Sequence, residues 1–288
     1  MQQIATLGPA GTFSELACEK YLAQQVASGQ ISTRDETQIR YYGSIKTSLQ
    51  AIGTDVSIGV LPIENLSEGF VSVVLDHLID ADLHIVAEIM LPIHFSLIAQ
   101  CRQADIETLF VQFVAAGQCT EFIDGLGGVK VVTTQSNMES LVLAREAGQR
   151  AAAVVPHHAV IADEYALHIA NINDYPHNQT RFLAFADRAA QYQPALGEQY
   201  KTSLVVLFDD DDHPGYLEEM LRSFTQRGIN LTSIVSRPTR QVFGKYHFFI
   251  DIDGHAQDLP IAQALREIAK LYKLKVFGSY IKAAEQSM

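Results

Sequence analysis

The chain has 288 residues, of which 48% are hydrophobic and 19% charged, which is enough for two domains with ordinary packed cores. Its net charge of -12 argues against a nucleic-acid partner, because phosphate binding needs clustered Lys and Arg side chains. No apolar run reaches the roughly 18 to 20 residues of a membrane helix, and the start lacks the pattern of a secretory signal. The 3 cysteines form no CxxC pair and are odd in number, so we expect a cytoplasmic protein without a disulfide framework.

Residues 1–186 alternate short apolar runs with periodic segments, which is typical of a layered α/β fold with parallel strands. Strands are expected at 4–7, 56–61, 84–90, 94–99, 109–113, 129–133 and 151–155. Helices are expected at 13–25, 70–79, 136–146 and near 159–165. Thr12 or Ser14 would cap the first helix, and Pro62 would end the second strand.

Residues 187–200 lack periodicity and contain Pro194 and Gly197, so this segment is the best linker candidate. Residues 201–282 then form a compact pattern. It consists of a strand (202–208), a helix (214–226), two strands (231–236 and 246–253), a helix (260–271) and a strand (273–280). The order βαββαβ is that of the ferredoxin-like motif.

Short motifs in this C-terminal unit resemble those of ACT domains. His213-Pro214-Gly215-Tyr216-Leu217 resembles the family's Pro-Gly-x-Leu turn, and residues 228–234 and 236–238 resemble its Ile-Asn-Leu-Thr and Ser-Arg-Pro signatures. The resemblance implies a regulatory domain that binds an amino acid, expected to be phenylalanine, at a turn and helix start suited to a carboxylate. The ligand residues implied are Gly215, Leu217, Asn230, Leu231, Ser236 and Arg237.

Two residues depart from the ACT pattern. Tyr216 stands where a small residue is usual, and Val235 stands where an acid is usual. A bulky Tyr216 could fill part of the pocket for the ligand's ring, and the missing acid could leave Arg237 or the ligand's ammonium group without a partner. We therefore expect phenylalanine binding to be weakened or its effect changed.

The first 186 residues resemble the catalytic domain of prephenate dehydratases. The matching pieces, in order, are residues 8–14 (Gly-Pro-Ala-Gly-Thr-Phe-Ser), residues 62–65 (Pro-Ile-Glu-Asn) with Gly69, Ile93-His94, Gln118-Cys119 and residues 180–182 (Thr-Arg-Phe). The resemblance implies a domain of two α/β lobes, like a periplasmic binding protein, with the active site in the cleft between them. The implied organisation is a catalytic domain at 1–186, a linker at 187–200 and an ACT domain at 201–282.

The reaction implied is the conversion of prephenate to phenylpyruvate, with loss of carbon dioxide and of the ring hydroxyl as water. Aromatisation drives this reaction, so neither a cofactor nor a metal is expected. The enzyme has to hold two carboxylates and provide a proton donor at the ring hydroxyl.

The resemblance makes Thr180 the donor to the leaving hydroxyl, although the residue could also simply open a strand. A free threonine is a very weak acid, so it could act only by hydrogen bonding or concerted transfer in a dry site. Glu64 and Asn65 are expected on a loop at the end of a strand, where α/β folds bind ligands, with a turn or cap as the alternative for Asn65. Gln118 resembles a glutamine that faces the cleft. The predicted catalytic residues are thus Thr180, Asn65, Gln118 and Glu64.

The predicted substrate-binding residues are Arg181, Thr12, Ser14, Ser136 and Phe182. Arg181 could bind a carboxylate with two hydrogen bonds, or merely pair with a surface acid. Thr12 and Ser14 offer hydroxyls and amides at a helix start, which suit a carboxylate but also serve as simple N-caps. Ser136 retains a hydroxyl that the family places at the cleft, and Phe182 is expected to pack beneath the site.

Two segments depart from the dehydratase pattern. Residues 111–114 are Val-Gln-Phe-Val where Ser-His-Pro-Gln is usual, and residues 136–138 are Ser-Asn-Met where Ser-Thr-Ala is usual. Altered contacts keep open a prephenate decarboxylase that retains the ring hydroxyl, and an arogenate dehydratase. A non-catalytic amino-acid sensor is the alternative from another class. The intact Thr180 and Glu64-Asn65 favour dehydration. A homodimer or tetramer is expected, because ACT sheets pair along their edges.

Overall fold

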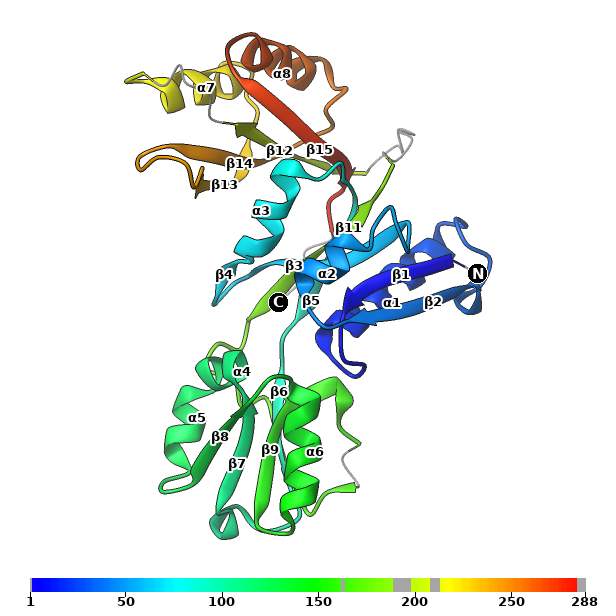
Figure 1. Cartoon of the computed structure of the whole chain (residues 1–288), viewed down its shortest axis with the longest axis vertical. Coiled ribbons are helices and arrows are strands. Elements are labelled where there is room, and N and C mark those ends of the chain that lie inside the picture. The colour runs from blue at the N-terminus through cyan, green and yellow to red at the C-terminus, as the bar shows by residue number, and fades with distance from the viewer. Residues whose placement is uncertain (1, 162–163, 189–197, 208–212, 284–288) are drawn as a thin grey trace.

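The computed structural model describes residues 2–161, 164–188, 198–207 and 213–283. They form three bodies stacked along the long axis of the molecule (Figure 1). A C-terminal domain lies at one end. Lobe 1 (residues 2–92 and 179–186) lies in the middle, and lobe 2 (residues 93–178) lies at the other end. The predicted α/β class with two lobes and a C-terminal domain is confirmed.

Lobe 1 is built on a mixed sheet. Its strands, in spatial order, are β2 (Thr37–Tyr42), β1 (Gln2–Leu7), β3 (Ile58–Asn65), β11 (Gln179–Ala186) and β5 (His84–Pro92), with β4 (Gly69–Phe70) on β3. Helix α1 (Phe13–Ala27) packs on one face, while α2 (Ile45–Gln50) and α3 (Ser72–Asp80) pack on the other. Strand β1 is parallel to β2 and β3, but β11 is antiparallel to both of its neighbours.

The prediction that Pro62 ends its strand is wrong, because β3 continues through Pro62 to Asn65. Pro62 pairs with Phe182 beside a shift of register between Arg181 and Phe182. Such a bulge interrupts the ladder of hydrogen bonds, which is where a strand tolerates a residue without an N–H group. As a result, Glu64 and Asn65 are the last two residues of a strand and not part of a loop.

Lobe 2 has a second mixed sheet. Its strands, in spatial order, are β10 (Leu167–Ala170), β6 (Phe95–Ala99), β9 (Ala151–Pro156), β7 (Thr108–Gln112) and β8 (Lys130–Thr134). Its helices are α4 (Phe113–Gln118), α5 (Thr120–Gly125) and α6 (Asn137–Ala147). The helix expected near 159–165 is wrong for the described residues of that range. There, Val160 and Tyr165 both pack on the lobe core, a spacing that does not share one face of a helix.

The chain crosses between the lobes twice, and the two crossings lie side by side. Gln179 pairs with Pro92, and the Ile93 amide donates to the Asn178 carbonyl at 2.8 Å. Thr180 follows the second crossing directly, so the start of β11 lies where the two lobes meet.

The C-terminal domain has the predicted βαββαβ order. Its elements are β12 (Tyr200–Leu207), α7 (Tyr216–Thr225), β13 (Leu231–Pro238), β14 (Tyr246–Asp253), α8 (Leu259–Leu271) and β15 (Lys273–Ile281), and its sheet order is β13-β14-β12-β15. Both helices cover one face of this sheet, and the other face packs on lobe 1 (Figure 1). Most of the expected linker, residues 189–197, lies outside the described residues, and β12 begins at its last position.

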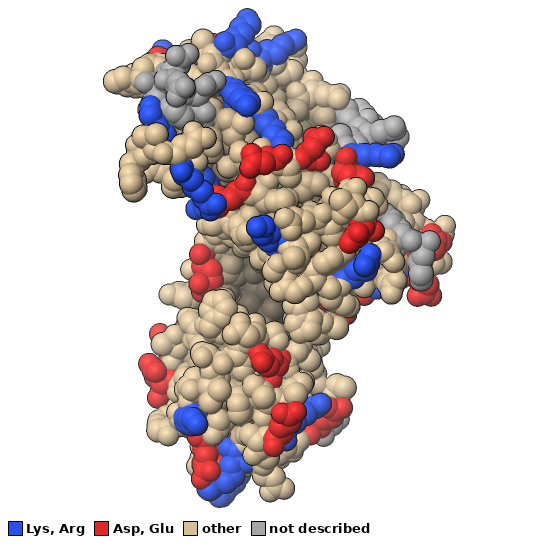
Figure 2. All heavy atoms as spheres, in the orientation of Figure 1, with Lys and Arg blue, Asp and Glu red and all other residues tan. Residues whose placement is uncertain are grey.

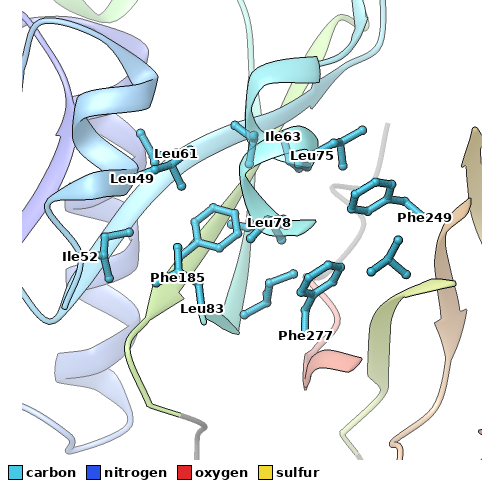
Figure 3. Close-up of a cluster of buried hydrophobic side chains, with 14 of the residues drawn as sticks. Leu49, Ile52, Leu61, Ile63, Leu75, Leu78, Leu83, Phe185, Phe249 and Phe277 are labelled. Atoms are coloured by element: carbon cyan, nitrogen blue, oxygen red, sulfur yellow. The ribbon is translucent and has the colours of Figure 1, made fainter. Parts of the chain in front are cut away.

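One apolar core runs across the boundary between this domain and lobe 1. Figure 3 shows Phe249 and Phe277 beside Leu75 and Leu78 of α3, and the two Phe rings stack with centroids 5.9 Å apart. Burying each such ring stabilises the docked arrangement by about 1.5–3 kcal/mol. A further close contact lies at Gly278, where a Cβ atom would come within 2.3 Å of a backbone oxygen of β5. Among the described residues, no helix is long and apolar enough to cross a membrane.

Candidate active site

The first feature of the site is a direct hydrogen bond between two of the predicted catalytic residues. Thr180 pairs with Asn65 across β11 and β3, and Nδ2 of Asn65 donates to Oγ1 of Thr180 at 2.8 Å. Both side chains are buried at the lobe 1 wall of the hinge. The sheet therefore brings together two residues that lie 115 positions apart in the chain.

The orientation of the Asn65 amide is fixed by its other neighbours. Its Oδ1 accepts hydrogen bonds from the backbone amides of Ser67 at 3.0 Å and Glu68 at 3.1 Å, and from the Ser67 hydroxyl at 2.8 Å. Backbone amides can only donate, so the atom they contact has to be the oxygen. The other atom, which faces Thr180, is then the NH2 group, and Thr180 accepts. Its own hydroxyl hydrogen remains available to another acceptor.

A second polar group joins lobe 2 to this wall. Gln118, buried at the end of α4, accepts a hydrogen bond from Nδ2 of Asn178 at 2.9 Å, and its Nε2 lies 3.5 Å from the Glu68 carboxylate. Asn178 is only 2% exposed, and among the described residues its Oδ1 has no donor. A buried acceptor without a partner is costly, which suits a position where a ligand completes the hydrogen bonding.

A pocket of about 410 Å³ opens at this place, lined by Leu66, Ser67, Tyr175, His177 and Asn178. Figure 2 shows the surface hollowed between the two lobes, with mostly uncharged residues around the hollow. The volume falls in the usual range of roughly 300–1,000 Å³ for sites of small molecules.

The start of α1 meets lobe 2 across the cleft. A Cβ atom on Gly11 would lie 2.9 Å from Sδ of Met138, and the Phe13 ring packs on Phe95 and His158 at centroid distances of 5.5 and 5.1 Å. Met138 belongs to the first turn of α6, so the N-terminal ends of α1 and α6 lie close together. Helix N-termini carry partial positive charge and free amides, which favours carboxylates.

The three hydroxyl residues predicted here have different roles in the free protein. Thr12 is the N-cap of α1, but its hydroxyl donates to the Pro9 carbonyl at 3.0 Å and caps no amide. Ser14 is buried in the first turn of α1. Ser136 is the N-cap of α6, with its Oγ accepting from the Glu139 amide at 3.1 Å.

The altered segment 111–114 also contributes a helix cap. The Gln112 side chain accepts from the amides of Val114 and Ala115, at 2.9 and 3.1 Å, and so caps α4. Val111 is buried, and Phe113 is 62% exposed. The polar group that this segment retains is therefore engaged within α4, and an exposed aromatic ring stands beside it.

The structure corrects the placement of Glu64 and Arg181. These residues pair with each other across β3 and β11, next to the pair of Asn65 and Thr180. Adjacent residues of a strand point to opposite faces, so Glu64 and Arg181 face the C-terminal domain and not the cleft. They line a separate pocket of about 440 Å³ with Lys201, Asp251 and other residues of both domains.

Arg181 therefore pairs with acids of the protein and does not bind a substrate carboxylate. These acids, Glu88 and Asp251, are little exposed, whereas a surface acid had been expected. Glu64 lies 3.7 Å from Nη1 of Arg181, and burial raises the pKa of this carboxyl despite the nearby guanidinium. Glu64 as a catalytic residue and Arg181 as a substrate ligand have no support in this geometry.

Two neighbouring residues have packing roles. Phe182 is 2% exposed and lies in the core beneath the site, among residues of α1, β3 and β5. Cys119 is fully buried, and burial raises the pKa of its thiol to about 12, so it stays protonated. Within the described residues, no group of three or more His, Cys, Asp or Glu side chains is placed to hold a metal ion.

Sequence reasoning missed Ser67, Glu68 and Asn178. Ser67 and Glu68 follow Asn65 closely, in an arrangement typical of an Asx turn, which is a local signal. Asn178 precedes Thr180 by two positions, so the alternation of an extended chain could have placed it on the same side.

The predicted effector residues fall at two ends of β13. Gly215, at φ +99°, is the N-cap of α7, near the end of β13 that carries Ser236 and Arg237. Leu231 begins β13 and lies about 17 Å from Ser236, at roughly 3.3 Å per strand residue. Asn230 precedes Leu231, and its side chain donates to Asp253 at 2.7 Å. Leu217 is exposed on α7. No single pocket of one chain can hold both groups.

Two ACT departures have structural partners. Arg237 donates twice to Asp76 of α3, at 3.0 and 2.9 Å, so an acid of lobe 1 supplies the charge that Val235 lacks. Tyr216 is buried in the domain core, with its ring 4.4 Å from that of Tyr272. Its bulk fills the core between helix and sheet.

Comparisons with known proteins agree with this architecture. The family model for prephenate dehydratase matches residues 4–190, and that for the ACT domain matches residues 205–270. The chain is 33% identical to a bifunctional chorismate mutase/prephenate dehydratase of Aquifex aeolicus, covering 99% of this chain and 75% of that protein. It is 32% identical to a prephenate dehydratase of Amycolatopsis methanolica, over 98% of this chain and 90% of the relative.

A crystal structure of a prephenate dehydratase in complex with L-Phe, from Arthrobacter aurescens, superposes with a TM-score of 0.81. The two chains are 31% identical, and the match covers 99% of this chain and 92% of the other. The two-lobed domain followed by a βαββαβ domain is thus the architecture of a known family. This chain belongs to the prephenate dehydratase family and carries a C-terminal ACT domain.

Proposed function

We propose that the protein is a carbon–oxygen lyase that converts prephenate to phenylpyruvate, carbon dioxide and water. The observation that carries this proposal is the hydrogen bond from Asn65 to Thr180. Asn65 directly precedes Leu66 and Ser67, which line the inter-lobe pocket. Because Thr180 accepts that bond, its hydroxyl hydrogen can be donated to the ring hydroxyl of the substrate. A donor at the leaving group is the chief requirement of the reaction.

In the proposed reaction, the bond between the ring and its carboxylate breaks, and carbon dioxide leaves. The electron pair of that bond moves into the ring, which becomes aromatic, and the bond from the ring to the hydroxyl oxygen breaks. The hydroxide takes up one proton and leaves as water, so one proton is consumed per turnover. Thr180 passes on a proton only in concert with bond breaking and regains one from solvent, because a free threonine alkoxide would be far too basic.

The substrate's two carboxylates need binding groups. We assign them to the neighbouring N-termini of α1 and α6, with the hydroxyls of Thr12, Ser14 and Ser136. Oδ1 of Asn178 is the acceptor for the hydrogen of the ring hydroxyl, since it lacks a donor among the described residues. Gln118 holds Asn178 in place from the lobe 2 side.

We further propose that phenylalanine regulates the enzyme through its ACT domain. Gly215 and Ser236 lie at one end of β13 and Asn230 at the other, so a second copy of the chain would have to supply the missing half of a site. A homodimer with its ligands at the interface satisfies this requirement. Calorimetry with phenylalanine, together with light scattering, checks the stoichiometry and the assembly size.

The test of the activity is a product assay. Purified protein is mixed with prephenate, and the products are identified by mass and by the absorbance of phenylpyruvate in base. Phenylpyruvate supports the proposal, whereas a non-aromatic keto acid that retains the hydroxyl would establish a decarboxylase. Faster turnover of arogenate would establish an arogenate dehydratase, and no consumption of either substrate would leave a non-catalytic amino-acid sensor.

A further inference from the structure

Strand β11 connects the candidate active site to the ACT domain through two adjacent residues. Thr180 faces the cleft and contacts Asn65, while the next residue, Arg181, faces the ACT domain. One peptide unit separates them. Any displacement of the Arg181 backbone is therefore also a displacement of Thr180.

The Arg181 guanidinium is held on all sides. Nε donates to Glu88 of β5 at 2.6 Å, Nη1 to Asp251 of β14 at 2.6 Å, and Nη2 to the Tyr280 hydroxyl of β15 at 2.8 Å. Two of these three partners belong to the ACT domain. The Arg181 side chain is only 7% exposed, so the charge has little access to water that could replace a lost partner.

A second layer holds these partners in turn. The Ser203 hydroxyl bridges Asp251 at 2.5 Å and Tyr280 at 2.7 Å, and Lys201 of β12 donates to Glu88 at 2.6 Å. With Glu64 at 3.7 Å from Nη1 of Arg181, two cations thus face three acids, Glu64, Glu88 and Asp251. Burial alone would lower the pKa of Arg181, but Tyr280, Asp251 and Glu88 raise it, so the guanidinium stays charged.

The pairing of β3 with β11 is irregular beside Arg181, because Ile63 of β3 is an extra residue without a partner in β11. The register with β3 shifts between Arg181 and Phe182, where Pro62 interrupts the ladder. On its other side, β11 pairs with β5 in unbroken register from Gln179 to Ala184, so the irregularity is confined to the edge with β3. The side-chain contacts of Arg181 with Asp251 and Tyr280 add a link to the ACT domain directly beside Thr180.

From this arrangement we propose that Arg181 is a positioning residue, through which the docked ACT domain sets the position of the Thr180 hydroxyl. The proposal deepens the function proposed above and rests on it. Loss of the contacts with Asp251 or Tyr280 displaces Arg181, and with it the hydroxyl that has to meet the leaving group. Substrate binding at the N-termini of α1 and α6 is not affected, because α1 packs on the face of the lobe 1 sheet opposite to the one that contacts the ACT domain.

The test uses the full chain and two conservative variants in the ACT domain. Asp251→Asn and Tyr280→Phe each weaken one contact of Arg181 and change no residue of the cleft. Each is expected to lower kcat about tenfold while KM stays within about twofold, since a misplacement of about 1 Å costs on the order of 100-fold. If Asp251→Asn does not fold, Tyr280→Phe, which removes a single oxygen atom, carries the test.

The matched control is Lys275→Met. Nζ of Lys275 donates to the carbonyls of Leu78, at 3.1 Å, and of Ala81, so this residue also joins the ACT domain to lobe 1, but it does not contact Arg181. We expect its kcat to stay within about twofold of the wild type, even if its melting temperature falls as far as those of the other two variants.

Unchanged kcat in Asp251→Asn and Tyr280→Phe would overturn the inference. So would an equal loss in Lys275→Met, because general loosening of the domains would then explain the effect. A wild-type protein that does not turn over prephenate would instead overturn the proposed function, and the inference would fall with it.

Discussion

The substitution Asn65→Asp tests the orientation of the Thr180 hydroxyl, because it exchanges one NH2 group for an oxygen of nearly the same size. One carboxylate oxygen would keep the hydrogen bonds from the Ser67 and Glu68 amides, at 3.0 and 3.1 Å. The other would lie about 2.8 Å from Oγ1 of Thr180, where Nδ2 now donates. It cannot donate, so Thr180 would have to donate to it, and the hydrogen needed by the leaving group would point away from the substrate.

The expected loss follows from the strength of that new bond. A hydrogen bond to a charged acceptor contributes about 1.5–3 kcal/mol, and turning the hydroxyl back to the substrate costs at least this amount. Because about 1.4 kcal/mol corresponds to a factor of ten in rate, kcat should fall roughly 10- to 150-fold. The free energy of unfolding should fall by about 1–3 kcal/mol, since Nδ2 of Asn65 also donates to the Gln179 carbonyl at 3.2 Å and this bond is lost.

The assay is the rate of phenylpyruvate formation at saturating prephenate near neutral pH, with urea unfolding in parallel. Asn171→Asp is the control, because it adds the same charge at an exposed position of lobe 2. A kcat of Asn65→Asp within twofold of the wild type would refute the reasoning. An equal loss in Asn171→Asp would do so as well, by assigning the effect to net charge.

Three further predictions concern docking, pH and the substrate pocket. Gly278→Ala should destabilise the protein by about 1–3 kcal/mol in urea unfolding, because its Cβ would lie 2.3 Å from the Ile85 carbonyl oxygen. Gly117→Ala is the control and should not destabilise the protein, because the space around Gly117 is open. Equal stability of the two variants would contradict the docking of β15 against β5. Burial alone would raise the pKa of Glu88, but its two cationic partners lower it below the ordinary value of 4.5. The stability that ionised Glu88 contributes is thus present above that value and is lost as the pH falls through the lowered pKa. The unfolding free energy of Glu88→Gln should therefore fall less steeply with decreasing pH than that of the wild type. Identical pH dependence in the two proteins would count against the network. Asn178→Ala should lower kcat/KM about tenfold in the prephenate assay, as loss of one hydrogen bond to substrate predicts, and an unchanged value would exclude the contact.

The family and its two domains could be predicted from the sequence because their signals are local. Motifs such as Thr180-Arg181-Phe182 and Gly215 with its neighbours are short, and their order along the chain is itself informative. The burial of Cys119 could also be predicted, because the implied reaction requires no thiol nucleophile.

The placement of Glu64 and Arg181 could have been improved from the sequence. Neighbours in a strand face opposite sides, so Thr180 and Arg181 cannot both point into one cleft. Pro62 obscured this by indicating the end of a strand. Only the bulge at Ile63, which is a property of the pairing between β3 and β11, explains how β3 continues through Pro62.

Other features depend on contacts far apart in the chain. The bond between Gln118 and Asn178 joins residues 60 positions apart, and that between Arg181 and Tyr280 joins residues 99 apart. No local pattern identifies such partners, because a polar residue in a strand has the same local signature whether it faces solvent, a cleft or a second domain. The network under the ACT domain therefore emerged only from the folded structure.

The central claim is that the Thr180 hydroxyl drives the departure of the ring hydroxyl, and the most direct measurement compares Thr180→Val with the wild type under single-turnover conditions. We expect that the variant still binds prephenate with similar affinity but forms phenylpyruvate on the order of 100-fold more slowly, as loss of one oriented donor to a developing charge implies. Phenylpyruvate formation at the wild-type rate by Thr180→Val would contradict it.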